Sequence, residues 1–347
     1  MLTVSTAPRR VLIEQDDTSQ YLNFDFILDN AQGEGLRIDE IRLRALDAAG
    51  RLVTARRVVS WGAFPSVNTI GRTEIVRDGR VLVMNPFYSF PVRMPLHSLC
   101  YEFLFSTSTE KASATLSVYP DVYEPKTQLT LPVRGRWLIH DGHDFYSHHR
   151  RQDQTSKGAV ALGVSSNPVR YGNDFCLLGS GDSLYTGAGD STRDWYTFGA
   201  PVYATADGII ARCSGSLPDD EIGKSTFDFR KVFEDPYTLM GNHVILDHGN
   251  GEISSYSHLQ GASLEVRQGE RVRQGQMLGR VGLSGDTGDV VHLHYQLVDS
   301  HEFFSAEGLP CYFHQFLRVL GSRVEDVRVG RVDTGDIIET IDPPPGP

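Results

Sequence analysis

The chain has 347 residues, of which 40% are hydrophobic and 22% charged, and its formal net charge is −11. This length favours two domains over one hydrophobic core, and the composition is that of a folded globular protein. The acidic balance argues against a nucleic-acid partner and an anionic membrane surface, since both need a basic face, and no run approaches the roughly 20 apolar residues that span a bilayer.

Two features bear on the cellular compartment. The N-terminal stretch, MLTVSTAPRRVLIEQDD, has no apolar segment of signal-peptide length. This predicts a cytoplasmic location, or a periplasmic or extracellular one for a chain whose signal was removed. The four cysteines are widely spaced without a CxxC pair, and we interpret them as buried thiols, with disulfide partners as the alternative. They are Cys100, Cys176, Cys213 and Cys311.

Residues 1–130 have the pattern of short strands. Apolar and polar residues alternate over 21–28 (YLNFDFIL), as in a half-buried strand. The alternation over 36–46 (LRIDEIRLRAL) changes phase between Ile38 and Ile41, which predicts a bulge or break. Many short strands and no cluster of chemically active residues predict an immunoglobulin-like β-sandwich that is a packing or binding module without catalytic residues.

Three hairpins are predicted from glycine-containing turns between apolar runs. The turns are Asp78-Gly79, Asp207-Gly208 and Gly249-Asn250-Gly251. We expect the strands on either side of each turn to pair with each other.

Beyond a boundary near residues 124–137, histidine and glycine become frequent. Two polar stretches, 179–194 and 214–241, are predicted as long loops that line a site, or else as tolerated surface insertions, and the second could contain a short helix. Residues 321–347 form a C-terminal extension, whose final DPPPGP we expect to be disordered.

The segment VVHLHYQLVD, 290–299, places two histidines one residue apart in an apparent strand. Residues i and i+2 of a strand face the same side, so His292 and His294 can serve one site. One imidazole could bind a metal while the other reaches a water on that metal. The alternative is a pair of solvent-facing histidines on an exposed strand.

Five motifs occur in order along the second half of the chain. They are Asp174 before an apolar strand, GAPVYATADG at 199–208, YSHL at 256–259, GERVRQGQMLG at 269–279 and HLHYQL at 292–297. Residues 135–318 thereby resemble the lysostaphin-type (LytM-like) zinc metalloendopeptidases, whereas the first 130 residues are outside the resemblance. The implied fold is all-β, with the lysostaphin-type antiparallel sheet, a duplicated hybrid motif, in a peptidase domain over 131–320.

The resemblance implies a role for each matching residue. His294 and Asp174 would be zinc ligands, and His292 and His258 would be catalytic residues that orient the water or stabilise the oxyanion. Zinc lowers the pKa of its bound water to about 7 and polarises the scissile carbonyl, and neutral imidazoles can shuttle the proton. His243 and His248 are interpreted as structural.

The chain departs from the usual family pattern at Arg170, where a first ligand histidine is expected four residues before Asp174. Part of the family takes this histidine from an upstream loop, and VRYGND at 169–174 resembles that subset. The loop at 140–153 carries four histidines. Its Ser147-His148-His149 fits best with His149 as the third zinc ligand and His148 as the second choice.

The resemblance implies a zinc-dependent endopeptidase that cuts peptide cross-links of bacterial peptidoglycan, with Zn²⁺ as the expected cofactor and no other cofactor-binding residues. The alternative is a degenerate member that acts as a zinc-binding or non-catalytic scaffold or regulator. A biotinyl or lipoyl carrier domain would also explain the glycine rhythm, but a carrier needs a lysine at a hairpin tip, and the turn TADG has none. The oligomeric state is left open.

Overall fold

The computed structural model describes residues 2–31 and 34–340, so the predicted disorder of DPPPGP lies outside the described residues. Contacts divide the chain into two units. The first unit contains 1–124 and 153–166, and the second contains 125–152 and 167–347. Both are built almost entirely of β-strands. Among the described residues, the structure has no helix that is long and apolar enough to cross a membrane.

The first unit contains three sheets in the described part of the chain. One has the order β1 (Leu2–Ala7), β4 (Asp25–Asn30), β8 (Gly79–Met84). The second has the order β11 (Lys111–Val118), β10 (Ser98–Ser106), β5 (Leu36–Leu46), β6 (Leu52–Val59), with β7 (Glu74–Ile75) beside β5. The third has the order β12 (Asp121–Val122), β2 (Leu12–Gln15), β3 (Ser19–Tyr21), β9 (Ser89–Pro91). Two short helices, η1 (Ser66–Ile70) and α1 (Lys157–Ala161), complete the unit.

Aromatic side chains join the first two of these sheets. Phe26 of β4 lies edge-on to Tyr101 and Phe103 of β10, with ring centroids 4.8 and 5.0 Å apart. These positions are apolar because alternate residues of each strand face the same core. The predicted irregularity in β5 is confirmed, since the register with β10 shifts between Ile38 and Glu40. That the unit is immunoglobulin-like stays a prediction.

Of the three predicted hairpins, only the one that turns at 249–251 is confirmed, with β17 (Asn242–Asp247) antiparallel to β18 (Ile253–Leu259). The other two are wrong. β7 pairs with β5 while β8 pairs with β4, and β15 (Pro201–Tyr203) pairs with β20 (Met277–Arg280) while β16 (Gly208–Ser214) pairs with β17. A tight turn reverses the chain locally, but the strand that follows it pairs where its apolar face is best buried.

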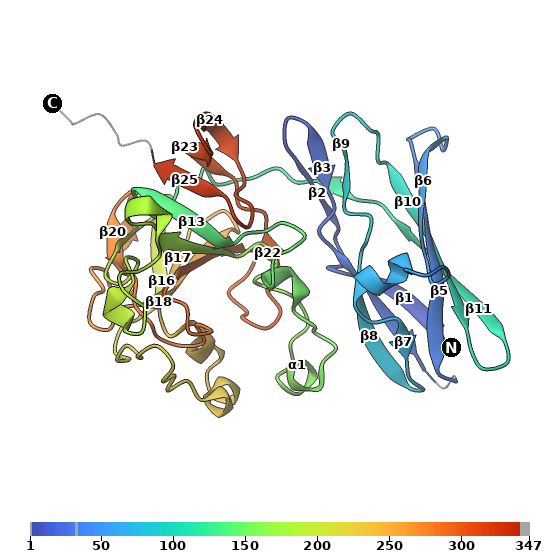
Figure 1. Ribbon diagram of the computed structural model, residues 1–347, viewed down its shortest axis with the longest axis horizontal. Coiled ribbons are helices and arrows are strands. Elements are labelled where there is room, and N and C mark those ends of the chain that lie inside the picture. The colour runs from blue at the N-terminus through green and yellow to red at the C-terminus, as the bar shows by residue number, and fades with distance from the viewer. Residues whose placement is uncertain (1, 32–33, 341–347) are drawn as a thin grey trace. The chain divides into compact units, whose positions relative to one another are not determined.

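The second unit is built on an eleven-stranded sheet (Figure 1). In addition to β16, β17 and β18, its strands are β19 (Arg271–Val272), β21 (Leu293–Val298), β14 (Asn173–Leu177), β13 (Arg136–Asp141), β25 (Ile337–Thr340), β23 (Phe313–Leu320), β24 (Arg323–Gly330) and β22 (Gly308–Leu309). The order is β19-β16-β17-β18-β21-β14-β13-β25-β23-β24, with β22 beside β21. The residues after 320 thus supply β24 and β25, and β25 pairs with β13.

One face of β18 and β21 is buried in the core of the second unit, where Tyr256 and Tyr295 lie edge to face. By strand alternation, the opposite face carries the polar side chains of Ser257, His294 and Gln296. Three loops of this unit contain short 3-10 helices. These are η2 (His149–Arg151), η3 (Ser180–Asp182), η4 (Thr192–Asp194), η5 (Phe229–Phe233) and η6 (Pro236–Met240), so the helical structure expected in 214–241 is present.

All four cysteines are free thiols. Cys176 and Cys311 are buried, whereas Cys100 and Cys213 are partly exposed. The thiol interpretation is therefore confirmed, but complete burial holds for only two of them.

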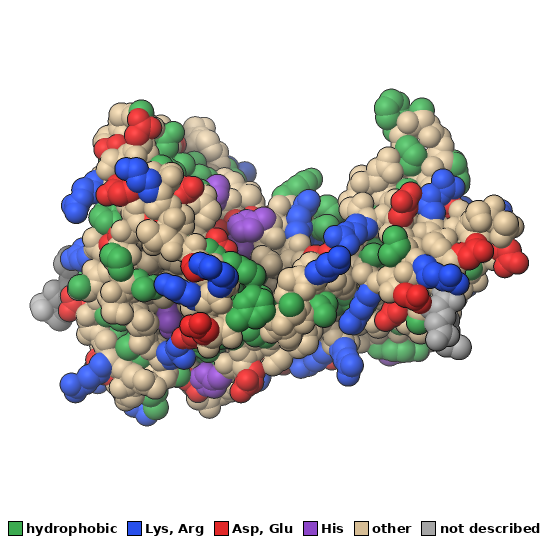
Figure 2. Space-filling view, turned by 90° about the horizontal axis from the view of Figure 1, so that it is seen from below, with side chains coloured by type: hydrophobic (Ala, Val, Ile, Leu, Met, Phe, Trp, Pro, Cys, Tyr) green, Lys and Arg blue, Asp and Glu red, His purple; other side chains and the backbone are tan. Residues whose placement is uncertain are grey.

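On the face drawn in Figure 2, acidic and basic side chains are interspersed.

Candidate metal centre

Two strands bring His292 and His294 to one carboxylate. β21 begins directly after His292, and its His294 is the register partner of Asp174 in β14. His294 Nδ1 lies 2.9 Å from Asp174 Oδ1, and His292 Nε2 lies 3.5 Å from the same oxygen. All three side chains are buried. The two histidines therefore share one site, and they are not an exposed pair.

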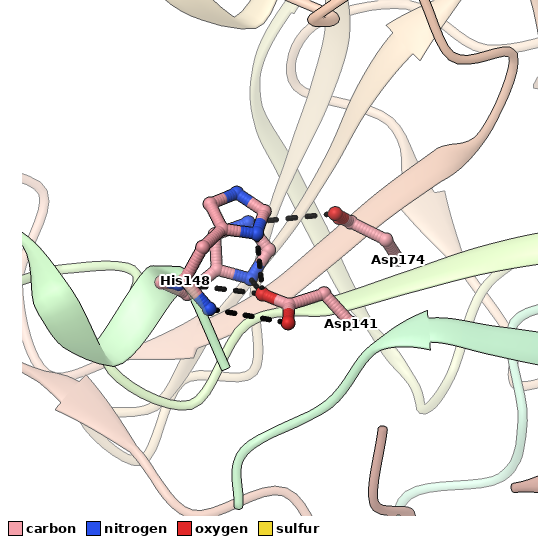
Figure 3. Close-up of side chains that lie close together, drawn as sticks. Asp141, His148 and Asp174 are labelled. Carbon is pink, nitrogen blue, oxygen red and sulfur yellow. Dashed lines mark hydrogen bonds and ion pairs between the residues drawn. The ribbon is translucent and has the colours of Figure 1, made fainter. Parts of the chain in front are cut away.

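The loop after β13 brings a third histidine to Asp174. His149, in η2, places Nε2 3.6 Å from Asp174 Oδ2, and its ring centroid lies 4.7 Å from that of His294. His149 is buried, whereas the side chain of His148 is 64% exposed and its Nδ1 contacts Asp141 (Figure 3). Of the two neighbours, His149 is the one that reaches Asp174 with a ring nitrogen.

Asp141, the last residue of β13, was not recognised in the sequence. Its Oδ2 lies 2.8 Å from Nδ1 of both His148 and His149, and it accepts a hydrogen bond of 2.8 Å from Ser147 Oγ (Figure 3). Burial raises the pKa of Asp141, but the contacts with the two histidines outweigh this and hold the pKa below its ordinary value. Asp141 thus anchors the histidine loop as a carboxylate. An aspartate beside the apolar residues of a strand, as at Asp174, was the available signal.

His258 and His292 have the same hydrogen-bonding arrangement. Nδ1 of His258 donates to the carbonyl of Ser284 at 2.8 Å, and Nδ1 of His292 donates to the carbonyl of Val290 at 2.9 Å. Because a carbonyl only accepts, each Nδ1 carries the proton and each Nε2 has a free lone pair. The rings lie 4.9 Å apart. Burial lowers the pKa of both histidines, and that of His258 lies well below the usual value. Both imidazoles are therefore neutral near pH 7.

His294 is oriented by Gln296, two residues further along β21. His294 Nε2 lies 2.8 Å from Gln296 Oε1, and its Nδ1 lies 2.9 Å from Asp174 Oδ1, so the ring is held between two hydrogen-bond acceptors. Burial raises the pKa of Asp174, but His292, His149 and His294 together hold it well below its usual value, so the carboxyl is ionised. When the Nε2 proton is held by Gln296, Nδ1 is free to be a ligand, and a cation bound there would be shared with the Asp174 carboxylate.

The distances fit a zinc ion. Ligand atoms about 2.0 to 2.2 Å from a tetrahedral Zn²⁺ lie about 3.3 Å apart, and the contacts of 2.9, 3.5 and 3.6 Å around Asp174 bracket this value. Two sets of possible ligands share Asp174, and within each set the ligand atoms lie within 4.8 Å of one another. The sets are Asp141, His148, His149 and Asp174, and Asp174, His292 and His294.

The residues just before Asp174 make room for this cluster. Gly172 passes so close to the rings that a Cβ there would lie 2.9 Å from His294 Cε1 and 3.2 Å from His149 Nδ1. Arg170 is buried, and its Nε donates to Glu307 Oε1 at 2.6 Å. Arginine therefore has a structural ion-pairing position here, which agrees with the expectation that it is not a ligand.

The remaining histidines near the motifs are engaged elsewhere. His243 accepts a hydrogen bond from Arg212 at Nε2 and stacks on Tyr237, with centroids 5.3 Å apart. His248 donates from Nδ1 to the carbonyl of Asp207 and contacts Ser254 Oγ through Nε2. Within the upstream loop, His143 is buried against Tyr171.

Sequence comparison covers the centre of the second unit. Residues 194–304 match Peptidase family M23, a stretch that includes His258, His292 and His294 but neither Asp174 nor His149. Over 102 residues the chain is 34% identical to the peptidoglycan DD-endopeptidase ShyA of Vibrio cholerae serotype O1. These residues make up 29% of this chain and 18% of that protein. Over 99 residues it is 31% identical to the cell division protein DipM of Caulobacter vibrioides, and this stretch covers 28% of this chain and 12% of that protein.

The matched stretch thus spans less than a fifth of the length of either relative. Among solved structures, the chain is similar to the catalytic domain of lysostaphin from Staphylococcus simulans, with 22% identity and a TM-score of 0.25, over 40% of this chain and 74% of that one. The match over 194–304, together with the ordered motifs around it, identifies a domain of peptidase family M23 in this chain.

Proposed function

We propose that the second unit is a zinc-dependent endopeptidase that hydrolyses peptide bonds of bacterial peptidoglycan. The observation that carries the proposal is the convergence of His149, His292 and His294 on the buried carboxylate of Asp174. The family match and the 34% identity to a peptidoglycan DD-endopeptidase support the reaction and the substrate class. The first unit is proposed as a packing or binding module without catalytic residues.

The proposed ligands are His149 Nε2, Asp174 and His294 Nδ1. Three protein ligands with one open position are the usual arrangement of a catalytic zinc, which when bound lowers the pKa of its water to about 7 and polarises the scissile carbonyl. Asp141 beside His149 and Gln296 beside His294 are the outer partners that hold each ring in the orientation for binding. His292 could replace His149 in this set, because it also reaches Asp174.

His258 and His292 are the proposed proton carriers. Each is neutral, donates through Nδ1 to a backbone carbonyl and keeps an acceptor lone pair on Nε2. Nε2 can take a proton from the attacking water and return it to the leaving amine. The fixed Nδ1–H bonds prevent the rings from turning, so that the acceptor nitrogens stay in the site.

The second candidate is a family member that holds the fold but does not cleave. It is favoured by Arg170, which stands where the usual first ligand would be and is committed to Glu307. Elemental analysis of the purified chain and release of peptides from isolated peptidoglycan separate the two candidates, with Asp174→Asn as control.

One zinc per chain and cleavage that Asp174→Asn abolishes support the enzyme. One zinc without cleavage indicates a zinc-binding scaffold, and neither zinc nor cleavage indicates a metal-free scaffold.

A further inference from the structure

β17 and β18 pair through a bulge at His258. The register shifts between Asn242 and Val244, where β17 has one residue and β18 has two, Ser257 and His258. His258 has a φ of +61°, in the left-handed region that residues other than glycine rarely adopt. Strained backbone of this kind persists only where its surroundings hold it, and bulges often re-aim a side chain beside an active site.

The bulge turns the imidazole of His258 toward the other histidines. Tyr256, two residues earlier on β18, is buried in the core of the second unit. In a regular strand, His258 would face the same side as Tyr256. Its ring instead lies near the rings of His292 and His294, with centroids 4.9 and 6.0 Å away. The position of this proposed proton carrier therefore depends on a backbone conformation that needs support.

The segment after β20 supports His258 from two sides. The amide of Gly282 donates to the carbonyl of His258 at 2.9 Å, and Nδ1 of His258 donates to the carbonyl of Ser284 at 2.8 Å. The first bond fixes the backbone of the bulge, and the second fixes the ring. His292 differs, because the carbonyl that accepts from its Nδ1 belongs to Val290, only two residues earlier in the chain.

The side chain of Ser284 holds this carbonyl in place. Ser284 is 2% exposed, and its Oγ accepts from the amide of Asn242 and donates to the carbonyl of Leu259, both at 2.9 Å. Asn242 begins β17, and Leu259 directly follows His258 on β18. One hydroxyl thus ties the segment to both strands of the bulge, with its proton and a lone pair in use.

The long loop at 214–241 strengthens this attachment. The side chain of Asn242 accepts from the amide of Leu217 and donates to the carbonyl of the same residue, both at 2.9 Å. Gly241 passes so close that a Cβ there would overlap the carbonyl of Ser284. The loop therefore supports, near both of its ends, the residue that orients the ring.

We propose that Ser284 is a positioning residue for His258. Its hydroxyl joins the two strands of the bulge, and its carbonyl thereby keeps the imidazole in the tautomer with the proton on Nδ1 and the acceptor lone pair on Nε2. The inference rests on the proposed endopeptidase function, in which His258 carries a proton, and it adds to that step a residue outside the proposed zinc ligands.

Substitutions of the serine test the hydroxyl. Ser284→Ala removes both Oγ hydrogen bonds and leaves the carbonyl, whereas Ser284→Thr keeps a hydroxyl at the same place. Ser263→Ala is the matched control, because Ser263 Oγ also donates to a carbonyl, that of Gln260 at 2.8 Å, and accepts from an amide, that of Arg280 at 3.1 Å. Zinc content and melting temperature show whether each variant folds. If Ser284→Ala does not, Ser284→Cys replaces the hydroxyl by a weaker hydrogen-bonding group of similar size.

The direct readout is the tautomer of His258, measured by nitrogen NMR on the full chain with isotope-labelled histidine. Protonated and unprotonated ring nitrogens have distinct shifts, and His258→Ala assigns the signals. We expect a protonated Nδ1 and an unprotonated Nε2 for His258 in the parent, in Ser284→Thr and in Ser263→Ala. In Ser284→Ala the two signals should move toward the average of both tautomers, while those of His292 stay.

The second readout is cleavage of a wall-peptide substrate. The kcat of Ser284→Ala should fall by roughly 10-fold, with KM and zinc affinity within about 2-fold of the parent, because proton transfer needs an oriented acceptor. Parent-like His258 signals in Ser284→Ala, or an equal change in Ser263→Ala, overturn the positioning role. A zinc-loaded parent that cleaves neither the peptide nor isolated peptidoglycan overturns the proposed function, and the NMR signals then still decide whether Ser284 holds the ring.

Discussion

Replacing Gln296 by methionine removes the acceptor that holds His294 in one tautomer, while a side chain of similar length remains. In the parent, His294 Nε2 donates to Gln296 Oε1 at 2.8 Å, and both side chains are 6% exposed. Without the acceptor, the buried Nε2–H either stays unpaired, at a cost of roughly 1 to 3 kcal/mol, or the proton moves to Nδ1, the proposed metal-binding nitrogen.

Both outcomes oppose zinc binding. Loss of an outer partner of a metal-ligating histidine typically weakens the metal by about 10- to 100-fold, which is about 1.4 to 2.7 kcal/mol. Since the bond is short and buried, we expect Gln296→Met to lie toward the upper end of that range. Gln296→Glu keeps an acceptor at the same place and should retain affinity within about 3-fold of the parent.

The assay is competition for zinc against a chromophoric chelator at one pH, which reports a dissociation constant independently of catalysis. Gln268→Met, an exposed position, is the matched control. A methionine variant that binds zinc as tightly as the parent would refute the tautomer argument. So would equal losses in the methionine and glutamate variants, because a purely steric role does not distinguish an acceptor from an apolar group.

Three further predictions use the same chain. His149→Ala should abolish stoichiometric zinc, whereas His148→Ala, which changes an exposed ring, should leave most of it; the reverse result by elemental analysis would make His148 the ligand. His258→Ala and His292→Ala should keep one zinc and lower kcat on a wall-peptide substrate by roughly 100-fold or more, and loss of zinc in the His292 variant would instead make it a ligand. Arg170→Met should lower the free energy of unfolding by about 3 to 5 kcal/mol in denaturant titrations, because Glu307 loses its ion pair with the buried arginine. A change below about 1 kcal/mol would contradict this.

Local patterns in the sequence determined a large part of this protein. The alternation in HLHYQL predicts that His292 and His294 share a face of any strand, and both rings do contact the same carboxylate. The phase change between Ile38 and Ile41 predicts the β5 irregularity, and the Gly-Asn-Gly turn predicts the β17–β18 hairpin. These features depend on residues within a few positions of one another, so a single sequence contains all the information they need.

Tertiary structure decided what joins distant parts of the chain. Asp174 and His294 are 120 residues apart in sequence, and Asp141 reaches His149 only because β13, β14 and β21 are neighbours in one sheet. The partner of a strand is chosen by burial of its apolar face across the whole unit, which no turn residue encodes, and this is why two predicted hairpins failed. The hydrogen bond from His294 to Gln296 likewise depends on a rotamer that the packed strand selects. Sequence thus specified which side chains are available, and the sheet order specified which of them meet.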